Sequence, residues 1–465
     1  MTAPPADLLD ALRQVVGDRH VLTDPAVTQG YCTDWTGRYR SGACPVVRPG
    51  DAAEVATVVA LHAQAGVPLV VQGGNTGLVG GGVPHAAAHV LSTTRLTRLD
   101  EIDEEQATVT VGAGVTLAEL QQVARARGLR TGVDLASRDS ATVGGMVATN
   151  AGGLRVLRFG HVRAQLTGIE AALGTGAVVS HLDVPYKDNT GYDLAGLLCG
   201  SEGTLGVVTA ATVRLYPLAD QAATALVGFD DGAAAVAFIT ALRHHVPTLE
   251  AVELMTAAGA RLVSRSADVP LPLATEPAFL VLLEATGGHA TSDVEAALEA
   301  LAPAYTHATI AMDEAGRRSL WRLREGHPVA ISERGAAHKL DVTLPMRALS
   351  AFIDEAPRAL ARALPGAEVY LFGHAADGNV HVNVVGTSPH DPRATDVVFG
   401  LVAEHGGSIS SEHGIGVAKR EWLHLNRSQA ELETFGRLKA LFDPAGVLNP
   451  GVLIPSTVEV AGAVA

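Results

Sequence analysis

The stretch PLVVQGGNTGLVGGGVP at residues 68–84 decides how the sequence is interpreted. Residues 68–72 predict a buried β-strand, and six glycines free the backbone of the loop that follows it. In such a loop successive backbone N–H groups can approach an anion, and Asn75 and Thr76 add side-chain hydrogen bonds. No Gly-Lys-Ser/Thr follows and no helix opens on the third glycine, which excludes a Walker loop and a dinucleotide fingerprint. Taken alone, the loop is equally well a structural turn.

Two further runs of small residues lie downstream, SATVGGMVATNAGG at residues 140–153 and CGSEGTLGVV at residues 199–208. Small side chains there let a flat ligand approach the backbone. Short β-branched runs alternate with helical periods up to about residue 217, which predicts an α/β or α+β arrangement. The expected elements are helices at 54–65 and 117–127 and strands at 68–72, 107–112 and 165–173.

A composition shift at residues 218–223 marks the expected start of a second domain. The pattern that follows is strand, helix, strand, twice over, as in a ferredoxin-like domain with both helices on one face of a four-stranded sheet. Ser292 and Glu295 have the spacing of a capping box at the start of the second helix. We expect strands at 224–228, 249–254, 278–285 and 306–312 and helices at 232–243 and 292–302.

The composition is that of a well-packed globular chain, which excludes disorder and coiled coil. The 465 residues are 47% apolar and 18% charged, and 34 basic against 49 acidic residues give a net charge of −15. An acidic surface repels phosphate backbones and anionic lipid, so neither nucleic-acid binding nor stable membrane insertion is expected. A small anionic substrate therefore needs a local basic pocket, in a chain that has only four lysines.

The cysteines and the N-terminus predict a cytoplasmic protein. Cys32, Cys44 and Cys199 are too few and too scattered for a disulfide framework or a cysteine zinc site. The N-terminal stretch MTAPPADLLDALRQVV carries acids and lacks the basic and apolar regions of a signal peptide. Every stretch of about 18 mainly apolar residues is interrupted by a charged residue, a glycine or a proline, so no transmembrane helix is expected.

Residues 369–385, VYLFGHAADGNVHVNVV, predict a β-hairpin around the Asp377-Gly378 turn signal. A two-residue turn at that point makes His374 and His381 cross-strand partners, with Asn383 on the same face. Two facing imidazoles are a ready bidentate metal site that needs a third ligand. The alternative is an ordinary pair of surface histidines.

The stretch GSISSEHGIGVAKR at residues 407–420 places an acid and an imidazole side by side, Glu412 and His413. A short strand is expected to end at this pair, and Gly414 and Gly416 then allow a tight turn into a helix. One residue of such a pair can ligate a metal while its neighbour points into the site. The alternative is a loop carboxylate beside a solvated histidine.

Two cations stand in LWRLREGHPVAISERGAAHKLDVTLP at residues 320–345. Arg324 is expected at a helix start and Lys339 in a strand that runs to the proline at the end of the stretch. A strand lysine among apolar neighbours requires an anionic partner, although two solvated surface charges are the alternative. Further on, Ser428 and Glu431 predict a capping box that starts a helix before LFDPAGVLNPG.

The three glycine-rich segments, in this order and spacing, resemble the FAD-binding domain shared by vanillyl-alcohol oxidase and p-cresol methylhydroxylase. The likeness is greatest to the D-2-hydroxyglutarate and D-lactate dehydrogenase branch of the FAD-linked oxidases, in which GGNTGLVGG, TNAGGLR and KDNTGYDL…GSEGTLG recur. The resemblance covers almost the whole chain and implies an α+β fold. It implies a PCMH-type FAD-binding domain at 1–217 (core 38–217), a ferredoxin-like α/β-plait substrate domain at 218–425, and a C-terminal helical segment at 426–465 that returns to the flavin.

The resemblance also implies which residues bind FAD. The first loop would cradle the pyrophosphate, the second segment would line the ribityl and isoalloxazine parts, and the third would meet the adenosine half or the flavin edge. In that order the residues are Gly73, Gly74, Asn75, Thr76, Gly77 and Leu78; Ser140, Thr142, Gly144, Gly145, Asn150 and Gly153; and Glu202, Gly203 and Val207. Asn449 would lie nearest the ring, with a plain helix-ending turn as the alternative. Leu78 and Val79 stand where some relatives have a covalently attached histidine, which predicts non-covalent FAD, with attachment through Cys199 as the alternative.

The same resemblance implies the catalytic residues. His374, His381 and Glu412 would ligate a divalent metal, usually zinc, and His413 would be the catalytic base. The substrate carboxylates would be bound by two cations, Arg324 and Lys339, with Asn383 in support. Pro328 stands where the family has a threonine, which removes a hydroxyl donor.

The expected activity is FAD-dependent oxidation of a D-2-hydroxy acid, with D-2-hydroxyglutarate as first choice, to the 2-oxo acid. The alternatives are a D-lactate dehydrogenase or glycolate oxidase-type subunit, and a non-catalytic subunit that only relays electrons. A metal-dependent hydrolase would leave the glycine-rich segments unexplained. An electron-transfer flavoprotein or a quinone is the expected electron acceptor, and a homodimer is the expected assembly.

Overall fold

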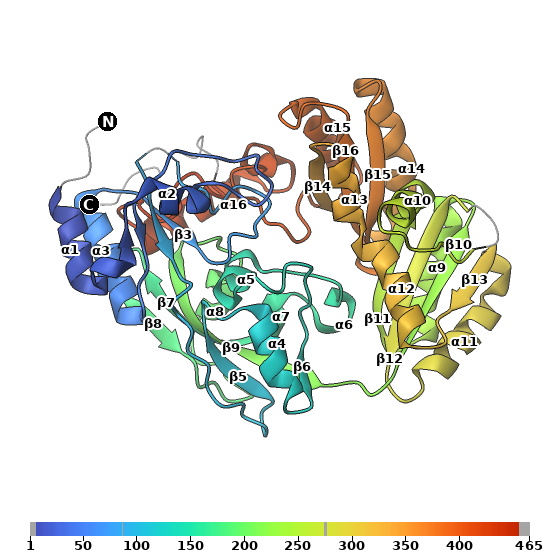
Figure 1. Cartoon of the computed structure of the whole chain (residues 1–465), viewed down its shortest axis with the longest axis horizontal. Helices are drawn as coiled ribbons and strands as arrows, with labels where there is room; N and C mark the ends of the chain where they lie inside the picture. Colours follow the sequence, from blue (N-terminus) through green and yellow to red (C-terminus); the bar gives the residue numbers. More distant parts are fainter. Residues whose placement is uncertain (1–5, 86, 274–276, 455–465) are drawn as a thin grey trace. The chain divides into compact units, whose positions relative to one another are not determined.

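The computed structural model describes residues 6–85, 87–273 and 277–454 (Figure 1). Internal contacts divide the chain into two compact units. Unit 1 comprises the described residues up to 153, residues 159–218 and those from 412 onward, and unit 2 comprises residues 154–158 and 219–411. The boundary near 218 coincides with the composition shift. Residues 412–425, which the sequence analysis placed in the second domain, instead pack with unit 1.

A four-stranded sheet opens unit 1, in the order β1-β2-β4-β3, with β1 antiparallel and the other three strands parallel. Val55 and Val58 of α3 are fully buried in one core with Leu69 and Leu91 of the sheet, so the apolar face of this helix covers the strands. The expected helix and strand are both present. The elements are α1 (Ala6–Val16), β1 (Val21–Leu22), α2 (Pro25–Thr28), β2 (Val46–Val47), α3 (Ala52–Ala65), β3 (Leu69–Gln72) and β4 (His89–Ser92).

The second sheet of unit 1 has five strands, in the order β5-β9-β7-β8 with β6 beside β9, and every pairing is antiparallel. Helix α16 starts at the expected capping box of Ser428 and Glu431, and its last turns pack on the core of this sheet. The elements are β5 (Thr108–Gly112), α4 (Leu117–Arg125), β6 (Leu129–Thr131), α5 (Val143–Thr149), α6 (Val156–Phe159), α7 (Val162–Gln165), β7 (Leu166–Leu173), β8 (Val178–His181), α8 (Leu194–Leu198), β9 (Gly206–Pro217) and α16 (Gln429–Phe442).

Unit 2 is built on one antiparallel seven-stranded sheet, in the order β13-β10-β12-β11-β15-β16-β14. Its first four strands, with α9 and α11, have the order of the expected ferredoxin-like domain, and the histidine hairpin extends the same sheet. The strands are β10 (Ala222–Phe229), β11 (Leu249–Thr256), β12 (Phe279–Thr286), β13 (His307–Ile310), β14 (His338–Thr343), β15 (Glu368–His374) and β16 (Asn379–Val385).

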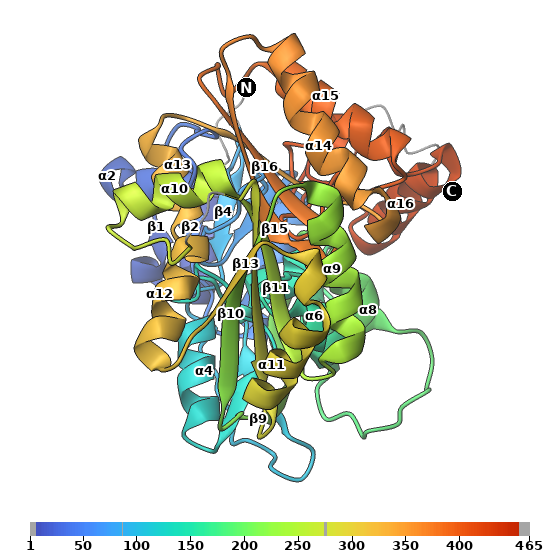
Figure 2. The same ribbon diagram turned by 90° about the vertical axis from the view of Figure 1, so that its right-hand side faces the viewer.

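Helices cover both faces of this sheet, α9, α11, α14 and α15 on one side and α10, α12 and α13 on the other (Figure 2). The second side carries the candidate site. The helices are α9 (Gly232–His245), α10 (Ala257–Ser266), α11 (Ala290–Ala300), α12 (Glu314–Glu325), α13 (His327–Glu333), α14 (Met346–Ala363) and α15 (Pro392–Glu404), and 3-10 helices lie at Asp18–His20, Gln29–Cys32, Ala302–Ala304, Ala375–Asp377 and Arg420–Leu425.

The capping box predicted for α11 is wrong. The helix starts two residues earlier than expected, and its N-cap His289 makes no side-chain cap. The Gly287-Gly288 pair permits the early turn, since the Ala290 N–H donates to the Gly287 carbonyl at 3.0 Å. Ser292 instead donates its hydroxyl to the His289 carbonyl. Among the described residues, every helix is too short or too polar to span a bilayer.

Candidate functional site

The histidine hairpin forms, but in a different register from the predicted one. Phe372 of β15 lies opposite His381 of β16, so the prediction that His374 and His381 are direct cross-strand partners is wrong. Residues 375–377 form a 3-10 turn and Gly378 follows at φ 83°, so the connection is wider than a two-residue turn. Because the shift is two residues, which is the side-chain period of a strand, both histidines keep the same face. Their ring centroids lie 5.5 Å apart.

Glu253 of strand β11 connects the first histidine to the predicted carboxylate clamp. It lies opposite His374 in the sheet and is fully buried. Its Oε1 accepts a hydrogen bond from His374 Nδ1 at 2.6 Å, and its Oε2 accepts one from Arg324 Nε at 2.5 Å. Burial alone raises the pKa of this carboxyl, but the charges and hydrogen bonds of both partners outweigh it and bring the pKa to about 2. The anionic carboxylate therefore keeps the His374 proton on Nδ1, which makes Nε2 the lone-pair nitrogen of the neutral ring.

Asp341 of strand β14 is a second buried carboxylate, and it accompanies the other histidine. It lies opposite His381 in the sheet, with Oδ1 3.5 Å from His381 Nδ1. It accepts hydrogen bonds from Asn379 Nδ2 at 2.7 Å and from the Ser411 backbone N–H at 3.0 Å. Each imidazole thus has a buried carboxylate beside its Nδ1. This is how proteins orient histidines for metal ligation.

The two predicted clamp cations reach the same face of the sheet from different elements. Arg324 is in the last turn of α12, not at a helix start as predicted, because Gly326 ends that helix. Its guanidinium carbon lies 4.6 Å from the centroid of the Phe372 ring. Lys339 lies in β14 as expected, opposite Asn383 of β16, and burial lowers its pKa. The sheet therefore gathers the clamp, the asparagine and the histidine pair.

The Arg324 side chain is only 6% exposed, and its charge is partly balanced by Glu253. Only its Nε donates to the protein within the described residues, which leaves the terminal N–H groups to bind a carboxylate in the bidentate manner. Pro328 stands in the first turn of α13, where it offers neither a hydroxyl nor a backbone donor.

In unit 1, the loop at 73–78 packs onto the second glycine-rich segment. A Cβ atom on Gly73 would lie 2.3 Å from Thr142 Oγ1, and one on Gly74 would lie 1.7 Å from the Ser140 carbonyl oxygen, so neither position accepts a side chain. Within the described residues, none of the backbone N–H groups of residues 74–78 donates a hydrogen bond to the protein. A run of available N–H groups at a glycine loop is the donor set that a pyrophosphate requires.

The second segment forms helix α5, which stands directly beside that loop. Thr142 caps it by accepting the Gly145 N–H at 3.3 Å, and Asn150 ends it in the left-handed conformation. Gly144 is pressed against Ala113, where an added Cβ would lie 2.5 Å from the alanine methyl group. Val207, also predicted to meet FAD, is fully buried in the apolar core of unit 1.

Glu202 and Asn449 tie the C-terminal stretch to the body of unit 1. The buried Glu202 carboxylate accepts the backbone N–H groups of Ile415 at 2.7 Å and Gly416 at 2.8 Å. Asn449 accepts the Val71 N–H at 2.7 Å and donates its amide to the Glu202 carbonyl at 2.6 Å. Gly203 lies against this amide, at φ 73°. Both predicted FAD ligands thus use their side chains to fix neighbouring backbone.

Glu412 and His413 lie in a loop of unit 1, and the short strand expected before them is reduced to one bridge at residue 408. Glu412 Oε1 accepts the Gly153 N–H at 2.6 Å, which connects two predicted site residues. The helix expected after this pair is the 3-10 helix at 420–425.

Sequence reasoning missed the two acids that organise the site, Glu253 and Asp341. Both are fully buried, and each stands in an apolar strand, AVELM and KLDVT. A carboxylate inside an apolar strand requires a buried partner, so the signal was available. Its partners are far away in sequence, however, and no spacing rule identifies them.

Comparison with known proteins agrees with this architecture. Residues 45–181 match the family described as FAD binding domain, and residues 218–453 match FAD linked oxidases, C-terminal domain. The solved structure of p-cresol methylhydroxylase with substrate bound has a TM-score of 0.76 at 17% identity and matches over 96% of each chain.

Two proteins related in sequence match almost the whole chain. A mitochondrial D-2-hydroxyglutarate dehydrogenase from Bos taurus is 35% identical over 97% of this chain and 84% of its own length. A D-2-hydroxyglutarate dehydrogenase from Xanthomonas citri pv. viticola is 36% identical over 95% of this chain and 96% of its own length. The protein is a FAD-linked oxidoreductase with a PCMH-type FAD-binding domain. It belongs to the FAD-linked oxidase family.

Proposed function

We propose that the protein oxidises a D-2-hydroxy acid, with D-2-hydroxyglutarate as first choice, to the 2-oxo acid. The observation that carries this proposal is the buried Glu253 carboxylate, which joins a carboxylate-binding arginine to a metal-competent histidine on one face of the sheet. In a chain with a net charge of −15, such a cationic cluster has to be built locally. Oxidation of a 2-hydroxy acid requires such cationic groups, because they bind the carboxylate next to the reacting hydroxyl.

FAD fits the donor set of unit 1, and when bound it would supply flavin N5 as the acceptor for the hydride on C2 of the substrate. Residues 74–78 offer the pyrophosphate their backbone N–H groups, and Gly73 and Gly74 allow the close approach of the second segment. Ser140 and Thr142 pack against the first loop, and we propose that they and Gly145 contact the rest of the cofactor. Since leucine and valine replace the attachment histidine, we propose that FAD is bound non-covalently.

A divalent metal, with zinc as first choice, fits His374, His381 and Glu412 by donor chemistry. Ring nitrogens of the two histidines lie within 4.8 Å of one another, and both rings are oriented by carboxylates. Asp341 binds the backbone of Ser411, the residue covalently attached to Glu412, so chain connectivity supports the third ligand. The metal would act as a Lewis acid that lowers the pKa of the substrate hydroxyl.

The remaining steps fall to side chains of this chain. Arg324 and Lys339 orient the substrate carboxylates, and Asn383, opposite the lysine, supports them with its amide. His413 accepts the hydroxyl proton on a ring nitrogen. With two cationic groups, the clamp favours a diacid over D-lactate. Both D-2-hydroxyglutarate dehydrogenase relatives support this choice.

Anaerobic flavin bleaching tests the proposal. The yellow protein is mixed without oxygen with D-2-hydroxyglutarate, its L-enantiomer, D-lactate and glycolate, and the flavin absorbance is followed. We expect the D-diacid to bleach the flavin fastest and the L-enantiomer to leave it oxidised. Bleaching by D-lactate or glycolate alone supports the alternative substrate, and no bleaching by any acid supports an electron-relay subunit. The electron acceptor, the assembly and the cytoplasmic location stay predictions.

A further inference from the structure

Two of the three cysteines, which looked scattered in the sequence, meet in the folded unit 1. Cys32 ends a 3-10 helix and Cys44 lies two residues before the start of β2, and their Sγ atoms lie 3.6 Å apart. A disulfide requires about 2.05 Å, so the two sulfurs need to approach by only about 1.5 Å. Both cysteines are free thiols.

The residues between the two cysteines form a closed loop. Thr33 and Arg40 pair as an antiparallel bridge, the Asp34 N–H donates to the Tyr39 carbonyl at 3.1 Å, and the Ser41 N–H donates to the Cys32 carbonyl at 2.9 Å. This cysteine loop, residues 33–43, therefore has its two thiols at its base. A bond between them would clamp the loop.

The cysteine loop supports the glycine-rich loop that binds the pyrophosphate in the proposed function. Asn75 Nδ2 donates to the Thr33 carbonyl at 2.8 Å, and Gln72 Nε2 donates to the Tyr31 carbonyl at 2.9 Å. An added Cβ on Gly80 would lie 2.7 Å from the Tyr39 ring, so the two loops are in close contact. A constraint on residues 33–43 is therefore passed to the cofactor loop.

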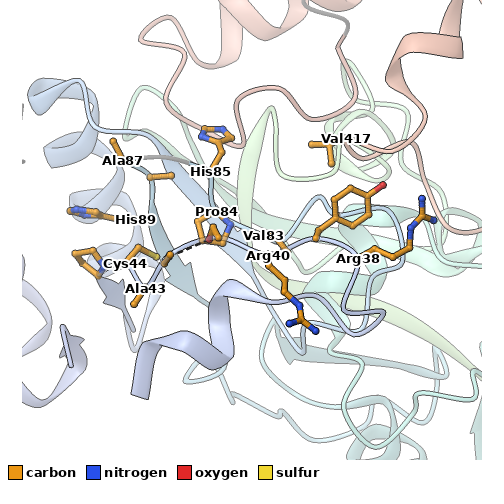
Figure 3. Close-up of a pocket in the computed structure, with 16 residues that line it drawn as sticks. Arg38, Arg40, Ala43, Cys44, Val83, Pro84, His85, Ala87, His89 and Val417 are labelled. Atoms are coloured by element: carbon orange, nitrogen blue, oxygen red, sulfur yellow. Dashed lines mark hydrogen bonds between the residues drawn. The ribbon is translucent and has the colours of Figure 1, made fainter. Parts of the chain in front are cut away.

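One of the two cysteines is partly exposed. Cys44 is half-buried and lines a pocket of about 780 Å³, with Arg40, Ala43 and Pro84 among its walls (Figure 3). Cys32 is fully buried. Burial and the neighbouring thiol raise the pKa of Cys44 to about 12, which makes its thiolate scarce and its first reaction slow.

We propose that Cys32 and Cys44 are a reversible dithiol–disulfide site that fastens the cysteine loop and thereby slows the loss of FAD. A low-molecular-weight disulfide is the oxidant. The Cys44 thiolate attacks one of its sulfurs, a mixed disulfide forms, and one thiol leaves with a proton. The Cys32 thiolate then attacks the Cys44 sulfur and releases the second thiol. Two protein thiols are oxidised and one reagent disulfide is reduced to two thiols.

The test uses the FAD-loaded protein equilibrated with oxidised or reduced glutathione. Peptide mass spectrometry under non-reducing conditions reports the cross-link, and the fluorescence of released FAD reports cofactor loss. We expect a peptide pair joined through Cys32 and Cys44, lacking two hydrogens, and FAD release slower by roughly fivefold or more. Reduction with dithiothreitol should restore the original rate.

Three variants provide the controls. Cys199→Ser should behave like the parent, because Cys199 lies outside the cysteine loop. In Cys32→Ser the reaction should stop at the mixed disulfide on Cys44. Cys44→Ser should not react with glutathione disulfide at all. If Cys32→Ser folds poorly because Cys32 is buried, Cys44→Ser serves as the variant that lacks the cross-link. Absence of the cross-link at any glutathione ratio, or a cross-link with an unchanged FAD release rate, overturns the proposal. Neither readout needs substrate, so failure of the proposed oxidation is detected separately by bleaching.

Discussion

Replacing Glu253 with glutamine isolates the link between the clamp arginine and the histidine pair. The carboxylate accepts one hydrogen bond on each oxygen, from His374 Nδ1 and from Arg324 Nε. Glutamine has nearly the same shape but only one accepting oxygen, so its NH2 group must face one of the two N–H donors. The Arg324 charge also loses its buried counter-ion.

The magnitude follows from the burial of the pair. Removing one partner of a buried ion pair costs about 3–5 kcal/mol, and the amide keeps one hydrogen bond, so we expect roughly 2–4 kcal/mol less stability. At roughly 2–4 °C per kcal/mol, unit 2 should melt at least about 4 °C lower. If the NH2 group faces His374, the imidazole proton moves to Nε2 and the ring loses its outward lone pair. Metal affinity should then fall about 10–100-fold.

The assay is metal competition with a chromogenic chelator, together with thermal unfolding and the KM for D-2-hydroxyglutarate. Glu284→Gln is a matched control, because Glu284 is also buried, lies on the adjacent strand β12 and pairs with Arg317 of the same helix α12. The control should lose stability but keep its metal affinity and KM. If Glu253→Gln lowers the melting temperature while metal affinity stays within twofold of the parent, Glu253 does not orient the histidine.

Four further outcomes are expected. Lys339→Met should raise the KM for the diacid about tenfold to a hundredfold more than that for D-lactate, and equal losses would show that the lysine binds the shared carboxylate. Removing the metal with a chelator should abolish turnover while FAD stays bound, and His374→Ala should have the same effect. Full activity in a metal-free sample would contradict the proposed metal site. Acid precipitation should release the yellow chromophore, and colour in the pellet would mean a covalent bond. Burial lowers the pKa of His62 and His89 to about 4, so below pH 6.5 the unfolded state binds more protons than the folded state. The free energy of unfolding should therefore fall between pH 6.5 and 4, by on the order of 2–3 kcal/mol per histidine. Denaturant titrations measure this, and a stability that does not change with pH over that range would refute it.

The sequence was sufficient where the deciding signal is local. The strands predicted at 224–228 and 249–254 are present, and short apolar runs suit them because nearly every residue in both strands is buried. The capping box at Ser428 could also be predicted, because its hydrogen bonds join residues only three positions apart. The chemistry of the candidate residues was also readable, because residue type and spacing limit what a loop or hairpin can bind.

The hairpin register shows where local rules stop. Asp377-Gly378 is a good two-residue turn signal, yet the chain forms a wider turn. An added Cβ on Gly378 would lie 2.0 Å from the Leu344 carbonyl oxygen, so a neighbouring segment occupies the space beside this glycine. Close packing against another segment, which the local sequence does not encode, decided the pairing.

The motifs of the family, the order of the strands along the chain and the residue types of the site can all be read from the sequence alone. That Arg324 and His374 share one carboxylate, and that Cys32 lies beside Cys44, follows from the folded structure. Glu253 lies 71 residues from the first of its partners and 121 from the second. A buried charge is tolerated only beside its counter-charge, and the sheet order that brings these residues together results from packing of the whole unit rather than from any single segment.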